Sequence, residues 1–124
     1  MKTINADDIR IQELPFVFEG RKYNLRCTMN VVADVQAQNG GDLMSALNDV
    51  SPFQSVLVWL ASMMNNYAEV VGWEDFAPYT ARALGNKLTP NQVPLTDIMG
   101  LVRSSLFVQN EAEADQQSEG NEKN

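Results

Sequence analysis

Residues 14–28 read LPFVFEGRKYNLRCT, and this stretch decides the fold class. In its second half Tyr23, Leu25 and Cys27 alternate with charged or amide side chains, which is the period of a β-strand with one buried face. The partner strand is expected over 14–19. Gly20-Arg21 is expected to form a type II′ turn, because glycine tolerates a positive φ at the first turn position. We therefore predict one β-hairpin near the start of the chain.

A hairpin alone is marginally stable in water, so its apolar face and its open edges need partners. We expect the apolar face to pack on helices of the same chain through Phe16, Phe18, Tyr23 and Leu25. The backbone edges of these strands then remain for pairing with another chain, so self-association is predicted to run along them. Ile9 and Ile11 also alternate with polar residues, which leaves open a short third strand.

The other segments read as helices, so we predict an α+β fold with the hairpin packed on a bundle of about four to five α-helices. The longest helix is expected from Pro52 to Val71, where apolar residues recur at three- and four-residue steps. Their sector spans roughly 140°, or about 200° with Trp59 and Ala61, so this helix should be central. Its predicted inward residues are Phe53, Val56, Leu57, Leu60, Met63, Met64, Tyr67, Val70 and Val71.

The remaining predicted helices cover 29–38, 42–47, 75–84 and 94–108, with a single helical turn at 89–93. Thr28 and Thr89 are N-cap residues, Gly40-Gly41 and Gly85 end helices, and Pro78 is tolerated in a first turn. The predicted inward residues of these helices are Val31, Val32, Val35, Leu43, Met44, Leu47, Phe76, Ala83, Leu84, Leu95, Ile98, Met99, Val102 and Leu106.

We predict a single α+β domain over residues 1–108 and a disordered acidic tail over residues 109–124. The tail has no large apolar residue, so burial cannot offset its ordering entropy. Its five acids and one lysine supply −4 of the chain's net charge of −7, which leaves −3 for the domain. Because the basic residues of the domain are scattered among acidic ones, nucleic acid is not expected as a partner.

The chain has no stretch of about 20 apolar residues, and its first residues lack the apolar region of a signal peptide. We therefore expect a cytoplasmic protein with no membrane partner. The lone Cys27 cannot form an internal disulfide, which agrees with a reducing compartment.

Candidate chemistry is sparse, because the chain has no histidine. Asp7-Asp8 and Glu74-Asp75 lie near predicted element starts, where capping explains them. Cys27 lies on the apolar face of a strand without a base to activate it, which favours a small buried hydrophobe over a nucleophile. We predict no catalytic residue, no cofactor and no metal site, and hence no enzyme.

The order of the elements resembles the tail assembly chaperones of long-tailed bacteriophages. The resemblance is carried by the hairpin FEGRKYNLR at 18–26, a valine-rich helix, a long apolar helix, and the closing LTPNQVPLTDIMGLVRSSLF at 88–107. It implies a protein of the host cytoplasm that binds the apolar tape measure protein and keeps it soluble until the tail tube polymerises around it. It also implies a homo-oligomer that is absent from the mature virion, with the tail tube protein as a second candidate partner.

The expected tape measure contact is an apolar helical surface, since flexible methionines suit varied apolar partners. The candidate contact residues are Trp59, Met63, Tyr67, Met99 and Leu101. Core packing is the competing interpretation for the methionines and for Trp59. Two other functions stay open: a structural tail or head-tail connector component of the virion, and a small bacterial adaptor that binds one folded protein.

Many proteins of this family are made in two lengths by programmed ribosomal frameshifting. The residues Glu122-Lys123-Asn124 can be encoded GAA AAA AAC, which contains the slippery heptamer A AAA AAC in frame. A longer frameshifted form is therefore a further hypothesis, which the sequence of the gene tests.

Overall fold

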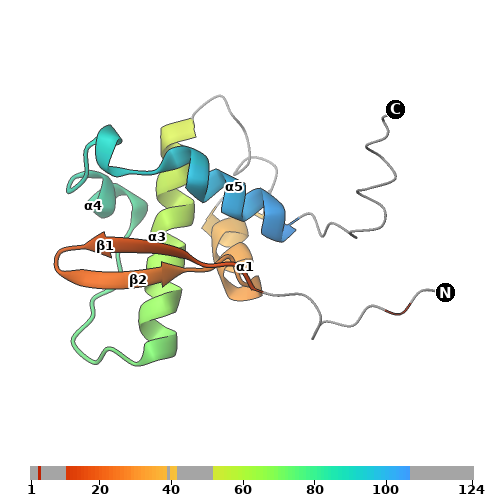
Figure 1. Cartoon of the computed structure of the whole chain (residues 1–124), viewed down its shortest axis with the longest axis horizontal. Coiled ribbons are helices and arrows are strands. Elements are labelled where there is room, and N and C mark those ends of the chain that lie inside the picture. The colour runs from red at the N-terminus through yellow and green to blue at the C-terminus, as the bar shows by residue number, and fades with distance from the viewer. Residues whose placement is uncertain (1–2, 4–10, 39, 42–51, 107–124) are drawn as a thin grey trace.

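The computed structural model describes residues 3, 11–38, 40–41 and 52–106 (Figure 1). These residues form a hairpin of β1 (Leu14–Phe18) and β2 (Arg21–Leu25), then α1 (Met29–Gln38), α3 (Pro52–Val71), α4 (Ala81–Gly85), the 3-10 turn η2 (Pro90–Gln92) and α5 (Leu95–Leu106). The predicted α+β fold with an N-terminal hairpin is confirmed. The predicted helix over 42–47, the tail over 109–124 and Ile9 lie outside the described residues, whereas Ile11 is described, exposed and in no strand.

The hairpin is antiparallel, with Phe16 opposite Tyr23 and Phe18 opposite Arg21. Its turn is therefore Glu19-Gly20, and the predicted Gly20-Arg21 turn was wrong. Both turn residues have positive φ, 51° and 79°, which is the type I′ pattern whose twist matches that of the strands. The two registers bury the same side chains, so the apolar pattern does not distinguish them; the side chain of Glu19, described below, favours the observed one. β2 also ends at Leu25, before Cys27.

The long helix α3 has the predicted bounds and forms the centre of the core, with the hairpin crossing it (Figure 1). Its buried side chains are Ser55, Val56, Trp59, Leu60, Ala61, Ser62, Met63, Met64 and Ala68. Phe53, Val70 and Val71 were predicted to face inward but are exposed. They lie in the end turns of a helix about 30 Å long, which extends past the short strands and helices that cover its middle.

The helices α1 and α5 pack on α3. Thr28 is the N-cap residue of α1 as predicted, and its Oγ1 accepts the Val31 N–H in a long hydrogen bond of 3.5 Å. After the helix, Gly40 has a φ of 66°, and the N–H groups of Gly40 and Gly41 donate to the carbonyl oxygens of Ala37 and Gln36. Val31 and Val35 are fully buried, and Val32 is half-buried against them. The buried residues of α5 are Ile98, Met99, Leu101 and Val102, with Leu95 and Leu106 half-buried.

The helix predicted over 75–84 is much shorter, since only Ala81–Gly85 is helical. Thr80 is its N-cap and accepts the Ala83 N–H at 3.0 Å. Residues before Thr80 stay non-helical because Asn65 of α3 binds the backbone of Tyr79 on both sides and Pro78 disfavours helix in the residue before it. Leu84 is buried and Phe76 half-buried as expected, but Ala83 is exposed. Gly85 allows close packing here, because a Cβ would lie 3.0 Å from Leu57 Cδ1.

The turn at Thr89 is confirmed, with the Thr89 N–H donated to Gln92 Oε1 at 2.8 Å. In the described part of the chain, no helix is long and apolar enough to cross a membrane.

Candidate functional site

The five residues predicted to contact a partner are placed mostly inside the fold. Trp59 and Met63 have exposed fractions of 0% and 1%, and Met99 and Leu101 are 7% exposed. Only Tyr67 is half-buried and presents surface in this conformation. Partner binding by these residues stays a prediction, and the structure directs attention to the surface around Tyr67.

The inner face of the hairpin is covered by helices of the same chain, as expected. Phe16, Phe18, Tyr23 and Leu25 are all buried, and β2 packs on α3. These side chains are therefore committed to the core. Self-association along the strand edges stays a prediction that concerns backbone groups rather than these side chains.

Beside β2, aromatic rings gather around the buried ring of Tyr23. Its centroid lies 6.3 Å from Tyr67 on α3 and 5.2 Å from Trp73 in the segment after α3, and Tyr67 and Trp73 meet edge to face at 5.8 Å. Both of these outer rings are half-buried. We call Tyr67 and Trp73 the aromatic shelf, because they offer apolar ring surface next to the β2 edge.

The tip of the hairpin is joined to the same segment by Arg21. Its guanidinium carbon lies 4.5 Å from the centroid of Trp73, and its Nη2 donates to Asp75 Oδ1 at 2.7 Å. The hydrogen bond and positive charge of Arg21 lower the pKa of Asp75. Arg21 thus combines a cation–π contact with an ion pair and fixes Trp73 beneath the hairpin.

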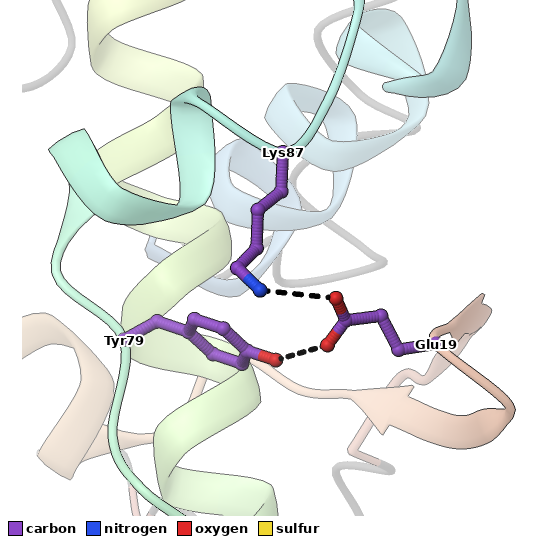
Figure 2. Close-up of polar contacts among 3 residues, drawn as sticks. All are labelled: Glu19, Tyr79 and Lys87. Carbon is purple, nitrogen blue, oxygen red and sulfur yellow. Dashed lines mark hydrogen bonds and ion pairs between the residues drawn. The ribbon is translucent and has the colours of Figure 1, made fainter.

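Glu19 makes a second connection at the tip, which Figure 2 shows. Its two carboxylate oxygens accept separate hydrogen bonds, one from Tyr79 Oη at 2.9 Å and one from Lys87 Nζ at 3.1 Å. The bond from Lys87, and then that from Tyr79, lower the pKa of Glu19. These contacts hold a non-glycine residue at positive φ, a conformation that is otherwise unfavourable.

The sequence did not predict the two hydrogen bonds to Glu19, because Tyr79 and Lys87 lie 60 and 68 residues from Glu19 along the chain. One signal was available: a glutamate before a hairpin glycine is an unusual first residue for a type I′ turn, where Asn, Asp or Gly is preferred. Such a residue indicates a tertiary contact that offsets its backbone strain.

These residues surround a recess of about 330 Å³ at the hairpin tip, lined by Phe18, Glu19, Arg21, Tyr23, Asp75, Phe76, Ala77, Tyr79 and Lys87. A second recess of about 260 Å³ lies on the far side of Phe76, lined by Asp34, Asn65, Asn66, Ala68, Glu69, Trp73, Phe76 and Pro78. In the first recess the charges are already paired, Arg21 with Asp75 and Lys87 with Glu19. The first recess therefore offers aromatic surface to a partner, and the charged side chains around it already form ion pairs with one another.

Two groups have strongly raised pKa values, Tyr79 in the first recess and Cys27 just after β2. Burial, followed by the hydrogen bond to Glu19, raises the pKa of Tyr79 to about 12, and burial raises the pKa of the Cys27 thiol to about 11. Both groups stay protonated at pH 7, so neither is an activated base or nucleophile. Within residues 3, 11–38, 40–41 and 52–106, no group of three or more acidic or cysteine side chains is arranged to hold a metal ion.

Comparison of the chain with family models, with curated proteins and with solved structures found no match.

Proposed function

We propose that the protein is a non-enzymatic tail assembly chaperone of a long-tailed bacteriophage, which binds the tape measure protein in the host cytoplasm before the tail tube forms. The supporting observation is the surface beside β2, where a strand edge that pairs with no further strand of the described residues adjoins the aromatic shelf of Tyr67 and Trp73. The element order of the fold agrees with the sequence resemblance on which the proposal depends.

Several exposed apolar side chains also support a role in binding a long apolar partner. Val70 and Val71 are 68% and 44% exposed at the end of α3, and Met29 is 81% exposed at the start of α1. Val17 is exposed on the outer face of β1. Single exposed apolar side chains are common on protein surfaces, so the adjacent pair Val70 and Val71 is the more informative feature. The net charge of −7 favours solubility of the complex.

Co-expression with the tape measure protein encoded in the same gene cluster tests the proposal. We expect the fraction of tape measure protein that stays soluble after centrifugation to rise several-fold when this protein is present, and the two to co-purify. The test variant Val70→Ser/Val71→Ser removes exposed apolar groups and should reduce the effect without loss of fold. An unchanged soluble fraction contradicts the proposal.

Mass spectrometry of purified virions gives an independent test. A chaperone leaves before the particle is complete, so its peptides should be absent from intact virions. Detection at the copy number of a structural subunit contradicts the proposal and supports a tail or head-tail connector component. A gene cluster without phage structural genes supports a bacterial adaptor.

A further inference from the structure

The two edges of the hairpin are not equivalent. In a hairpin closed by a two-residue turn, the pair next to the turn exchanges hydrogen bonds, and bonded and non-bonded pairs alternate from there. The pairs Val17–Lys22 and Pro15–Asn24 therefore direct their backbone groups outward. Proline has no N–H, so β1 presents only one outward donor, at Val17. β2 presents the N–H and C=O of both Lys22 and Asn24.

The two edges also have different neighbours. On the β1 side, α5 contacts the strand, and Ser104 donates to Gln12 Oε1 at 2.8 Å just before β1. On the β2 side, the C-terminal turns of α3 continue past the strand (Figure 1). Among the described residues, β2 pairs with no strand other than β1. The edge of β2 thus offers the more complete set of outward backbone donors and acceptors.

The chemistry next to β2 defines what fits there. A strand placed beside β2 would set the side chain that lies next to Tyr23 on the aromatic shelf, so that side chain should be apolar. Its neighbours along the strand would face outward beside Lys22, which is exposed and has no carboxylate partner in the described part of the chain. An acidic residue there would be matched in charge.

We propose that the β2 edge receives an extended segment of a partner protein by strand addition, with alternate apolar side chains on the aromatic shelf and an acidic side chain beside Lys22. Main-chain hydrogen bonds to Lys22 and Asn24 supply the affinity, and the shelf and the lysine supply the selectivity. This inference deepens the proposed function, since it rests on the protein having a protein partner and names how that partner is held.

One existing contact must be released for a strand to enter. Asn24 Nδ2 donates to Tyr67 Oη at 3.4 Å, a contact between a β2 side chain and the shelf. This distance lies beyond the usual range of hydrogen bonds, so little is lost by breaking it. Tyr67→Phe keeps the shelf and removes only this weak contact, so it should leave the binding of an added strand within about twofold of the wild-type value.

The test uses the full chain and a ten-residue synthetic peptide in which valine alternates with threonine and glutamate. We expect binding with a Kd on the order of 100 µM in a fluorescence titration. N-methylation of alternate peptide amides distinguishes the two peptide edges: one N-methylated set should abolish binding and the other should not. In hydrogen-exchange NMR, the amides of Lys22 and Asn24 should become protected in the complex, while that of Val17 should not.

A matched pair of variants locates the edge, because Val17 and Lys22 face each other in the same strand pair. Lys22→Pro removes an outward N–H from β2 and should weaken peptide binding by about tenfold or more, whereas Val17→Pro removes the equivalent N–H from β1 and should change it less than about twofold. Circular dichroism and urea unfolding establish that both variants fold. Lys22→Glu should weaken the glutamate peptide and favour a lysine analogue.

No binding up to about 1 mM peptide, equal weakening by the two proline variants, or protection of the Val17 amide would each overturn the proposal. The outcome is separable from that of the chaperone function. If wild type and Lys22→Pro solubilise the tape measure protein equally, the chaperone proposal stands and strand addition does not. If the peptide binds the β2 edge but the tape measure protein stays insoluble, strand addition stands and the chaperone proposal does not.

Discussion

The side chain of Asn65 makes two hydrogen bonds to the backbone of Tyr79: Nδ2 donates to the Tyr79 carbonyl oxygen and Oδ1 accepts the Tyr79 N–H, each at 2.8 Å. An amide side chain thereby replaces two backbone partners that a helix would otherwise provide. The residues just before α4 are therefore held out of the helical conformation, in the segment that brings Trp73 and Asp75 against Arg21 at the hairpin tip. One residue of α3 thus positions much of the candidate site.

Asn65→Ala should lower the free energy of unfolding by about 1–3 kcal/mol, because it leaves two half-buried backbone groups of Tyr79 without partners. Asn65→Asp keeps the acceptor for the Tyr79 N–H but sets a carboxylate oxygen against the Tyr79 carbonyl oxygen, so it should also destabilise the fold, and less at a pH low enough to protonate the new carboxyl group. Urea unfolding followed by tryptophan fluorescence measures both. Asn66→Ala is the control, since Asn66 bonds Asp34 and Ser62 rather than this segment; an equal effect at both positions would contradict the role assigned to Asn65.

Substitutions at Glu19 separate backbone strain from side-chain bonding. Glu19→Ala removes the bonds to Tyr79 and Lys87 and keeps a Cβ at a φ of 51°, so it should destabilise the fold. Glu19→Gly removes the same bonds and relieves the strain, so it should unfold at a higher urea concentration than Glu19→Ala. The reverse order would mean that the turn does not adopt the type I′ conformation in solution.

Local pattern was sufficient to predict the helix over 52–71, the start of α1 at Thr28 and the presence of a hairpin, because apolar period and capping residues act within a few positions. It failed where distant residues decide. The turn register depends on Tyr79 and Lys87, and the short α4 depends on Asn65.

Most of the candidate contact residues lie inside the fold, because the residue types that bind partners are also the types that form cores. A buried tryptophan and a binding tryptophan give the same sequence signal, and only the packing of α1, α5 and the hairpin around α3 places Trp59 inside. The site at the β2 edge depends on Pro15 and on strand register, which require the three-dimensional pairing. Tyr67 was predicted both as an inward residue of the long helix and as a candidate contact, and its ring is half-buried in the structure.

Acid should weaken the attachment of the hairpin tip. Bonds from Lys87 and Tyr79 lower the pKa of Glu19 from 4.5, and bonds from Arg21 lower the pKa of Asp75 from 3.8. A lowered carboxyl pKa contributes stability that is fully present above the ordinary value and is lost as pH falls through the lowered one. The free energy of unfolding should therefore fall as the pH is lowered below about 4.5, and less steeply in the Glu19→Gln/Asp75→Asn variant. Parallel curves for the two proteins would contradict this attribution.

Trp59 offers a test of its placement in the core. Its side chain has an exposed fraction of 0%, so Trp59→Ala should cost about 3–5 kcal/mol, a large share of the stability of a small domain. Trp59→Phe preserves most of the ring volume and should cost much less. Urea unfolding monitored by circular dichroism measures both. A Trp59→Ala protein with unchanged stability and reduced partner binding would contradict this placement and indicate that Trp59 lies on the binding surface.

Cys27 should be an unreactive thiol in the folded protein. Burial raises its pKa to about 11, so at pH 8 the thiolate is a fraction on the order of 0.1%, compared with roughly a quarter for an ordinary cysteine thiol. Ellman's reagent at pH 8 should therefore react at least about 100-fold faster in 6 M urea than in buffer. The Cys27→Ala variant supplies the blank. A folded-state rate close to the unfolded one would mean that the end of the hairpin opens readily, and strand addition at β2 would then have to compete with that opening.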